Sequence, residues 1–158
     1  MTSGSPATLS AIKGHEPTSP ETEVKARVLS WCSAWSSING VFQKDKLADI
    51  LTDGPVRMAA DFGDQIAVSI TRDAYLAFWS PLLSRTFSDW SLMIDSPIEV
   101  TAGHGMASAQ FHARIQGTTH AGERKSQRQH TRQVLEHHNG AWRLTQEQIK
   151  VSPDQACF

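Results

Sequence analysis

The sequence is short of the features that mark several large classes of protein. It has only two cysteines, Cys32 and Cys157, in 158 residues, which is too few for a disulfide framework, so a reducing, cytoplasmic location is expected. No run approaches the roughly 18 apolar residues of a membrane span. The first twenty residues hold no apolar segment of the kind that forms a secretory signal. We therefore expect no membrane partner and no secretory signal.

The sequence also has no large excess of charge of either sign, because its formal net charge is −1. This balance argues against nucleic acid as the main partner. The distribution is nevertheless uneven, since residues 112–132 carry five basic side chains against Glu123 alone: Arg114, Arg124, Lys125, Arg128 and Arg132. The stretch is either an anion-binding stripe or the solvated outer face of a hairpin.

The motifs of nucleophilic, phosphate and metal chemistry are missing as well. There is no Gly-x-Ser-x-Gly and no phosphate loop. Cys32 lies between two tryptophans and is expected to pack as a small hydrophobic side chain. No two of the seven histidines show a metal-ligand spacing beside a carboxylate. We expect no metal and no cofactor.

The first half of the chain has helical periodicity. Residues 1–19 are rich in Ser, Thr and Pro and are expected to be a disordered tail. A helix is predicted from Pro20 to Asn39-Gly40, with an apolar face of Val24, Val28, Trp31, Trp35 and Ile38. A short helix over 47–51 ends at Asp53-Gly54. After strands at 56–62 and 67–70, Thr71 caps a third helix that Pro81 kinks or ends.

The second half alternates like a series of strands. Segments 90–95 and 98–101 look like one strand interrupted at Pro97, and 106–117 places alternate apolar residues on one face. A turn follows at 117–122, then strands at 127–136 and 142–151 around the hairpin signal Asn139-Gly140. The pattern predicts one α+β domain over 20–154, with a short C-terminal tail at 155–158.

Five stretches carry a family resemblance: Trp31–Trp35, Met58–Phe62, Arg72–Trp79, His130–Val134 and Asn139–Leu144. Over about residues 22–154 the chain resembles the SnoaL-like, ketosteroid-isomerase-like branch of the NTF2-like superfamily. The resemblance implies a cone, in which a curved mixed β-sheet wraps a deep pocket that three N-terminal helices close. It also implies a homodimer. Members include isomerases, dehydratases, epoxide hydrolases, polyketide cyclases and non-catalytic binding or association domains, so the fold alone does not fix the reaction.

Asp61 is the candidate catalytic base. It follows an apolar strand, and an apolar cleft disfavours the charged form of a carboxylate and raises its pKa towards useful values. The resemblance places it where isomerases of this family carry their proton-shuttling aspartate. The alternative is an aspartate that caps the turn at Gly63-Asp64.

Four aromatic side chains are candidates to wall a pocket for a flat, ring-containing ligand: Trp31, Trp35, Tyr75 and Trp79. Trp31 stands where the resemblance implies a tyrosine that donates to a developing oxyanion, and an indole N–H is a weaker acid than a phenol. Core packing is the alternative for all four. Tyr75 is the only tyrosine of the chain.

The remaining candidates lie on the last strands. Many SnoaL-like relatives carry His-Glu-His where this chain has Gln146-Glu147-Gln148, so any mechanism resting on those histidines is lost. Gln146 and Gln148 are candidates to bind substrate, with Glu147 on the opposite face. His112, or His130 with Arg132, could orient a substrate oxygen, and alternation alone does not decide which faces point inwards.

Together these residues predict a cofactor-independent SnoaL-like enzyme. It would bind a hydrophobic cyclic molecule and catalyse isomerisation, cyclisation or dehydration, with Asp61 as base and His130 or Arg132 steadying an oxygen. The competing interpretation is a non-catalytic ligand-binding or dimerisation domain. A weaker one is an epoxide hydrolase, which needs a second carboxylate that only Glu147 or Asp95 could supply.

Overall fold

The helices and strands of the chain follow the predicted order. The computed structural model describes residues 18–152, so most of the expected N-terminal tail, the tail at 155–158 and Cys157 lie outside the described residues. The described elements are α2 (Pro20–Trp35), α3 (Lys44–Ile50), β1 (Pro55–Asp61), β2 (Ile66–Thr71), α4 (Arg72–Thr86), β3 (Phe87–Ile94), β4 (Glu99–Ala102), β5 (Met106–Thr119), β6 (Arg124–His138) and β7 (Ala141–Val151).

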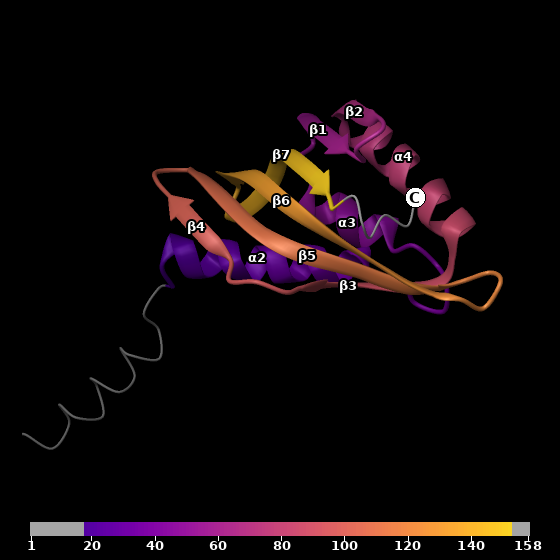
Figure 1. Ribbon diagram of the computed structural model, residues 1–158. Helices are drawn as coiled ribbons and strands as arrows, with labels where there is room; N and C mark the ends of the chain where they lie inside the picture. Colours follow the sequence, from indigo (N-terminus) through magenta and orange to yellow (C-terminus); the bar gives the residue numbers. More distant parts are fainter. Residues whose placement is uncertain (1–17, 153–158) are drawn as a thin grey trace, which may run out of the picture.

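The strands form one mixed sheet in the order β2-β1-β7-β6-β5-β3, with β4 beside β5 on the same edge as β3. The β1–β7 pairing is parallel and the other described pairings are antiparallel. Figure 1 shows the sheet bending from β3 and β5 up to β1 and β2, with the helices inside the bend. The expected α+β cone with a curved mixed sheet is confirmed.

Helix α2 begins as predicted but ends early. The Ser19 hydroxyl accepts a hydrogen bond from the Thr22 N–H at 3.2 Å, and Pro20 occupies the first turn. The helix stops at Trp35 because Ser36 and Ser37 bond to β3 instead, through the N–H groups of Leu92 and Trp90 at 3.0 Å. Ile38, predicted on the buried helical face, is exposed and lies outside the helix.

Helix α4 starts at the predicted cap, where the Thr71 hydroxyl accepts from the Ala74 N–H at 3.0 Å. Pro81 was expected to kink or end this helix, yet the helix continues to Thr86. Pro81 and Ala77, whose carbonyl loses its helical partner, are both exposed, so water can satisfy that carbonyl. Tyr75, Trp79 and Leu83 are buried at four-residue spacing, and this apolar stripe holds the helix against the sheet.

The core fills the space between the helices and the concave face of the sheet. Alternate residues of β5 are buried as predicted: Ala107, Ala109, Phe111, Ala113 and Ile115. The small alanines leave room for the indole of Trp31, whose centroid lies 5.8 Å from the Phe111 ring. The interior is therefore a cluster of aromatic rings packed on a strand whose inward side chains are mostly small.

Gly117 was predicted to open a turn but lies within β5, opposite Trp90 of β3. A Cβ at this position would lie 2.4 Å from the Asp89 carbonyl oxygen and 2.7 Å from the Phe87 ring. Only glycine lets β3 and the Phe87 ring approach β5 this closely. Strand β5 therefore continues through Gly117, and the turn follows Thr119.

We expect Gly117→Ala to lower the free energy of unfolding by about 2 kcal/mol, because the new methyl group forces backbone and ring to shift. Urea denaturation followed by tryptophan fluorescence measures the loss. Gly54→Ala is the matched control, since its Cβ would meet only the Thr52 hydroxyl, at 3.9 Å. Equal stabilities of the two variants would contradict this account of Gly117.

Candidate functional site

Glu147 lies on the concave face of the sheet with no exposed surface. A bulge in β7 turns it inwards. Leu135 pairs with Leu144 and Val134 pairs with Gln146, which leaves Thr145 without an opposite residue in β6. The extra residue reverses the alternation along the rest of the strand. The structure thus decides which face of β7 points inwards: Glu147 lies inside, and Gln146 and Gln148, the candidates to bind substrate, are exposed on the outer face.

Two hydrogen bonds hold the Glu147 carboxyl group. The Tyr75 hydroxyl donates to Oε1 and the Gln133 side-chain amide donates to Oε2, each at 2.8 Å. Burial raises the pKa of Glu147 to about 7, although the bonds from Gln133 and Tyr75 favour the charged form and oppose the rise. Burial also raises the pKa of Tyr75, and the neighbouring Glu147 charge adds to the increase. Tyr75 thus remains a proton donor while Glu147 can exchange a proton near neutral pH.

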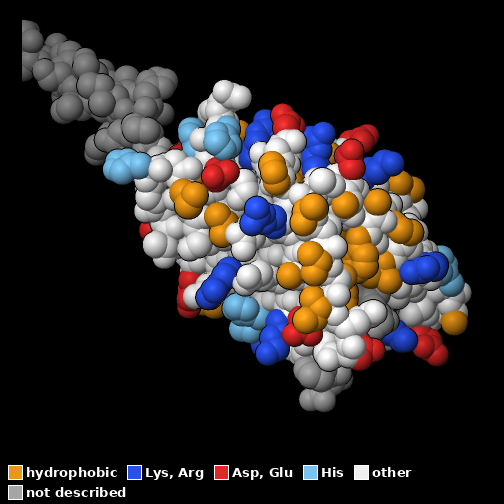
Figure 2. All heavy atoms as spheres, turned by 90° about the horizontal axis from the view of Figure 1, so that it is seen from above, with side chains coloured by type: hydrophobic (Ala, Val, Ile, Leu, Met, Phe, Trp, Pro, Cys, Tyr) orange, Lys and Arg blue, Asp and Glu red, His pale blue; other side chains and the backbone are white. Residues whose placement is uncertain are grey.

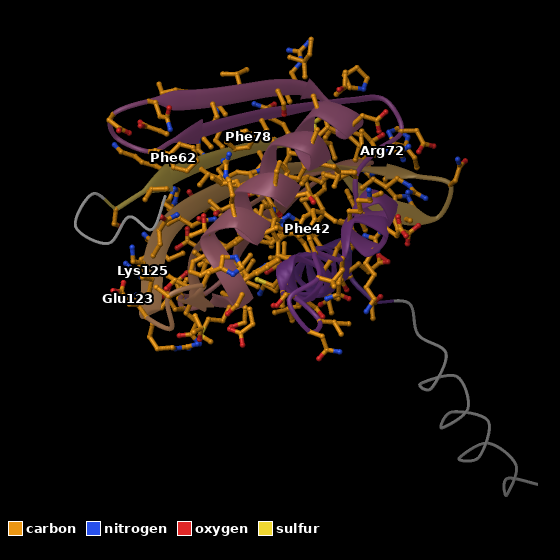
Figure 3. The ribbon with its side chains drawn as sticks, turned by 90° about the vertical axis from the view of Figure 1, so that its right-hand side faces the viewer. Phe42, Phe62, Arg72, Phe78, Glu123 and Lys125 are labelled. Atoms are coloured by element: carbon orange, nitrogen blue, oxygen red, sulfur yellow. The ribbon has the colours of Figure 1, made fainter. Side chains whose placement is uncertain are left out.

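Tyr75 belongs to a cluster of four packed rings, which we call the aromatic cage: Trp31, Trp35, Tyr75 and Trp79. Trp35 is central, with ring centroids 5.8 Å from Trp31, 6.3 Å from Tyr75 and 5.0 Å from Trp79. All four residues are buried, and the structure brings together the four side chains predicted to wall a pocket. Their contact with a ligand stays a prediction. Phe62 and Phe78, 6.3 Å apart, flank the cage beside α4 (Figure 3).

The indole N–H groups of the cage are unused donors. The Nε1 atoms of Trp31, Trp35 and Trp79 are buried and form no hydrogen bond of good geometry within the described residues. Those of Trp31 and Trp35 lie close enough to the Tyr75 hydroxyl to oppose the rise in its pKa. Buried donors without partners are costly, so the cage can offer hydrogen bonds to an oxygen atom that enters it.

A stripe of neutral polar side chains leads along β6 to Glu147. Its members alternate on the concave face and all are buried: Gln127, Gln129, Thr131 and Gln133. The sequence does not single out this stripe, because β6 is polar on both faces. Leu135 could have indicated which face of β6 is buried, because this apolar residue lies on the same face of the strand as the stripe. Among the buried residues of the described chain, Glu147 is the one that carries a formal charge at neutral pH.

Cys32 lies near this carboxyl group, and its thiol is not a nucleophile. Burial, together with the Glu147 charge, raises the pKa of Cys32 to about 12. The prediction that Cys32 packs as a small hydrophobic side chain agrees with its burial.

Asp61 lies on the convex face, which we call the outer face, and not in the apolar cleft expected for it. Met58 and Ala60 point inwards and are buried, so alternation turns Asp61 outwards, where it is half-buried. Its Oδ1 accepts a hydrogen bond from the Gly63 N–H at 2.8 Å. This is the turn-capping arrangement that the sequence offered as the alternative. A catalytic role of Asp61 stays a prediction.

His130 and Arg132 share the outer face with Asp61. The three residues line one hollow of about 390 Å³, together with Gln148 and Lys150. The structure therefore gathers the three predicted catalytic residues, but it places them on the opposite face of the sheet from Glu147 and the aromatic cage. His112 of β5 packs edge-to-face against His130, with ring centroids 5.1 Å apart.

The basic stretch forms part of the same outer face. Asp95 bridges Arg114 and Arg128, with N···O distances of 3.4 and 3.1 Å. Two of the five basic side chains are thus neutralised by a carboxylate. Asp95 cannot serve as the second carboxylate of an epoxide hydrolase beside Glu147, because it lies outside the cone.

Residues 18–152 contain neither a metal-ligand cluster nor a membrane-spanning helix. No group of three or more His, Cys, Asp or Glu side chains there could hold a metal ion. No helix in this part of the chain is long and apolar enough to cross a membrane.

Comparisons with known proteins find similar solved structures but no match by sequence. No protein-family profile matches the chain, and no curated protein does so either. A protein from Streptomyces avermitilis, provisionally assigned as a dehydratase of the NTF2-like family, superimposes with a TM-score of 0.69 at 12% identity, covering 85% of this chain and 99% of the other.

Two other solved structures show how varied the similar proteins are. A protein from Xanthomonas campestris, provisionally assigned as a calcium/calmodulin-dependent protein kinase II association domain, gives a TM-score of 0.65 at 19% identity over 84% of this chain and 87% of the other. A type 2 hexachlorocyclohexane dehydrochlorinase gives 0.66 at 9% identity over 83% and 84%. At such identities the likeness establishes the fold alone.

Proposed function

Because the chain has the NTF2-like fold, we propose that it is a cofactor-independent enzyme that moves a proton within an uncharged, apolar, cyclic small molecule. The observation that carries the proposal is Glu147, a fully buried carboxyl group with its pKa raised to about 7. A base with this pKa exchanges protons efficiently at neutral pH. Asp61 lacks comparable surroundings, so the role of base passes from Asp61 to Glu147.

The lining of the interior supports an uncharged substrate. Glu147 is the charged member of the buried residues, and the amides and hydroxyl of the β6 stripe are neutral. An anionic group would meet the Glu147 charge with no buried cation to offset its desolvation. Flat rings, by contrast, complement the aromatic cage, and ketone or hydroxyl oxygens can accept from its buried indole N–H groups.

The chemistry needs only the groups already in place. Glu147 takes a proton from a carbon next to a carbonyl group, while an N–H of the cage donates to the oxygen on which negative charge develops. Returning the proton to another carbon completes an isomerisation. Returning it to a leaving hydroxyl releases water and completes a dehydration. Tyr75 and Gln133 hold the carboxyl group in one orientation throughout.

Substrate entry requires a movement of the protein. Glu147 has no exposed surface, and the cage rings lie in contact with one another. The packing of α2 and α4 against the sheet therefore has to loosen when a substrate binds. The same enclosure excludes water from the reacting carbon.

The test compares two carboxylates on opposite faces of the sheet. Wild type, Glu147→Gln and Asp61→Asn are screened by thermal shift against flat, uncharged polycyclic ketones, terpenoids and polyketide-like phenols, and each stabilising compound is analysed by mass spectrometry and NMR after incubation. We expect Glu147→Gln to bind but to lower product formation by about a hundredfold, and Asp61→Asn to react like wild type. The opposite pattern would return the role of base to Asp61.

A non-catalytic binding domain is the second candidate function, and the observation that favours it is the close packing of the aromatic cage. The same screen separates the two functions. A compound that stabilises wild type and Glu147→Gln equally, and that both leave chemically unchanged, supports the binding domain.

A further inference from the structure

The outer face of the sheet carries a groove that the proposed reaction does not use. Its volume is about 750 Å³, within the range of small-molecule sites. The apolar wall comes from β2, where Ile66, Val68 and Ile70 are 65%, 70% and 65% exposed. Figure 2, which looks down on the top of Figure 1, shows apolar side chains gathered on this face, with Lys and Arg side chains among them and charged ones along the margins. We call this surface the outer groove.

One end of the outer groove carries charged side chains of both signs, Asp53, Arg57, Arg72 and Asp73, and the other end adjoins a polar, basic hollow. The groove shares Ala59 and Gln148 with the 390 Å³ hollow that holds His130, Arg132 and Lys150. The strand register explains the continuity, because Val68, Ala59, Gln148 and Arg132 lie side by side across four strands. The next row along the strands runs from Ile66 through Asp61 and Lys150 to His130. Apolar and cationic side chains thus adjoin within one depression.

The cations of the hollow have no partner of their own. Arg132 and Lys150 form no ion pair within residues 18–152, whereas Arg114 and Arg128 are paired with Asp95 and Arg72 is paired with Asp53. Asp61, the acidic residue of the hollow, already uses one carboxylate oxygen to cap Gly63. The charge left over is positive, and it lies next to an exposed apolar wall.

We propose that the outer groove binds amphipathic organic monocarboxylates. The apolar body of the ligand lies along Ile66, Val68 and Ile70, and its carboxylate lies between Arg132 and Lys150. The site adjoins Glu147, which also lines the outer groove, but the Glu147 carboxyl group is fully buried and bonded to Tyr75 and Gln133, and none of the proposed ligand contacts uses it. It therefore does not depend on the proposed enzymatic function.

His130 provides a built-in reporter of occupancy. Burial, His112 and Arg132 lower its pKa, while Glu99 on β4 acts in the opposite direction. The other charged groups facing it across the sheet are Lys150 on β7, Asp61 on β1 and Arg128 on β6. A carboxylate bound beside Arg132 adds negative charge near the imidazole, so binding is expected to raise the pKa of His130.

A second copy of this chain is the competing occupant, because the family resemblance led us to expect a homodimer. The charge pattern favours the small anion. A face-to-face dimer that covers this surface would have to take the unpaired Arg132 and Lys150 of both copies out of water, which is costly.

The experiment uses octanoate, with 1-octanol as its neutral counterpart. Titration calorimetry and histidine proton NMR are run on the full chain and on three variants: Arg132→Gln, Val68→Ser and the control Lys46→Gln. Lys46 is exposed on α3, away from the groove. We expect Arg132→Gln to weaken octanoate binding about fivefold and to leave octanol unchanged. Val68→Ser should weaken both ligands, and Lys46→Gln neither.

Two further readouts complete the design. Octanoate should raise the pKa of His130, and high ionic strength should weaken octanoate binding while leaving octanol binding unaffected. Equal binding of the two ligands, or a His130 pKa that octanoate does not move, would overturn the proposal. So would a dimer in light scattering that Val68→Ser converts to monomers while wild type binds no octanoate.

Discussion

Replacing Glu147 by glutamine is expected to make the protein more stable at pH 8 and to leave its stability at pH 4 nearly unchanged. The folded protein raises the pKa of Glu147 from 4.5 to about 7, with burial as the main cause. Below pH 4.5 the carboxyl group is protonated in both the folded and the unfolded states, so it carries no ionisation penalty. Glutamine resembles this neutral form in shape and in hydrogen bonding.

The sign follows from proton binding. Between pH 4.5 and 7 the folded state keeps the proton and the unfolded state loses it, so wild-type stability falls as the pH rises. The shift of about 2.5 pH units corresponds to roughly 3 kcal/mol, all of it lost above pH 7. Glu147→Gln does not titrate and escapes this loss.

Urea denaturation of wild type and Glu147→Gln at pH 4, 6 and 8 measures the difference. Glu123→Gln is the control, because Glu123 is exposed and the change should alter stability by less than about 0.5 kcal/mol at each pH. A Glu147→Gln variant that is less stable than wild type at pH 8 would mean that the charged carboxylate stabilises the fold.

Trp35→Ala is expected to cost about 3–5 kcal/mol of stability, the usual range for removing a large buried aromatic side chain. Trp35 contacts four other rings, and its own carbonyl accepts the indole N–H of Trp90 at 2.7 Å. Without the indole, α2 loses the ring contacts of Trp35 with Tyr75 and Trp79 of α4. The void would lie beside Tyr75 and would admit water to Glu147, so the pKa of Glu147 should fall.

Leu29→Ala is the matched control on the same helix, since Leu29 is 55% exposed. Trp35→Phe keeps one aromatic ring and should remain folded if the alanine variant does not. Urea denaturation ranks the three variants. A Trp35→Ala loss no greater than that of Leu29→Ala would contradict the central place of Trp35 in the core.

The fold was predictable because its periodic signals agree with its packing. Helical spacing found α2 and α4, and strict alternation identified the buried face of β5. The resemblance supplied the curvature of the sheet, which no local pattern encodes. The errors arose where tertiary contacts outweigh local preference, as at Ser36, which leaves the helix to bond to β3.

The site was harder to predict because the side chains of a strand point alternately to its two faces. One extra residue in a strand exchanges the inward-facing and outward-facing positions that follow it. The bulge at Thr145 turns Glu147 inwards, and the sequence Gln146-Glu147-Gln148 does not predict a bulge. Asp61 looked buried because it ends an apolar strand, although Met58 and Ala60 already occupy the inner face. Tyr75 was found on its helix, but its bond to Glu147 joins residues 72 positions apart.

The most direct test of this account is the pKa of Glu147 itself. The side-chain carboxyl carbon of Glu147 can be assigned by comparing carbon NMR spectra of wild type and Glu147→Gln, and then followed from pH 3 to pH 9. The account predicts a titration midpoint near 7. A midpoint at or below 4.5 would contradict it, because a carboxyl group that is fully charged well below neutral pH is not the poised base proposed here.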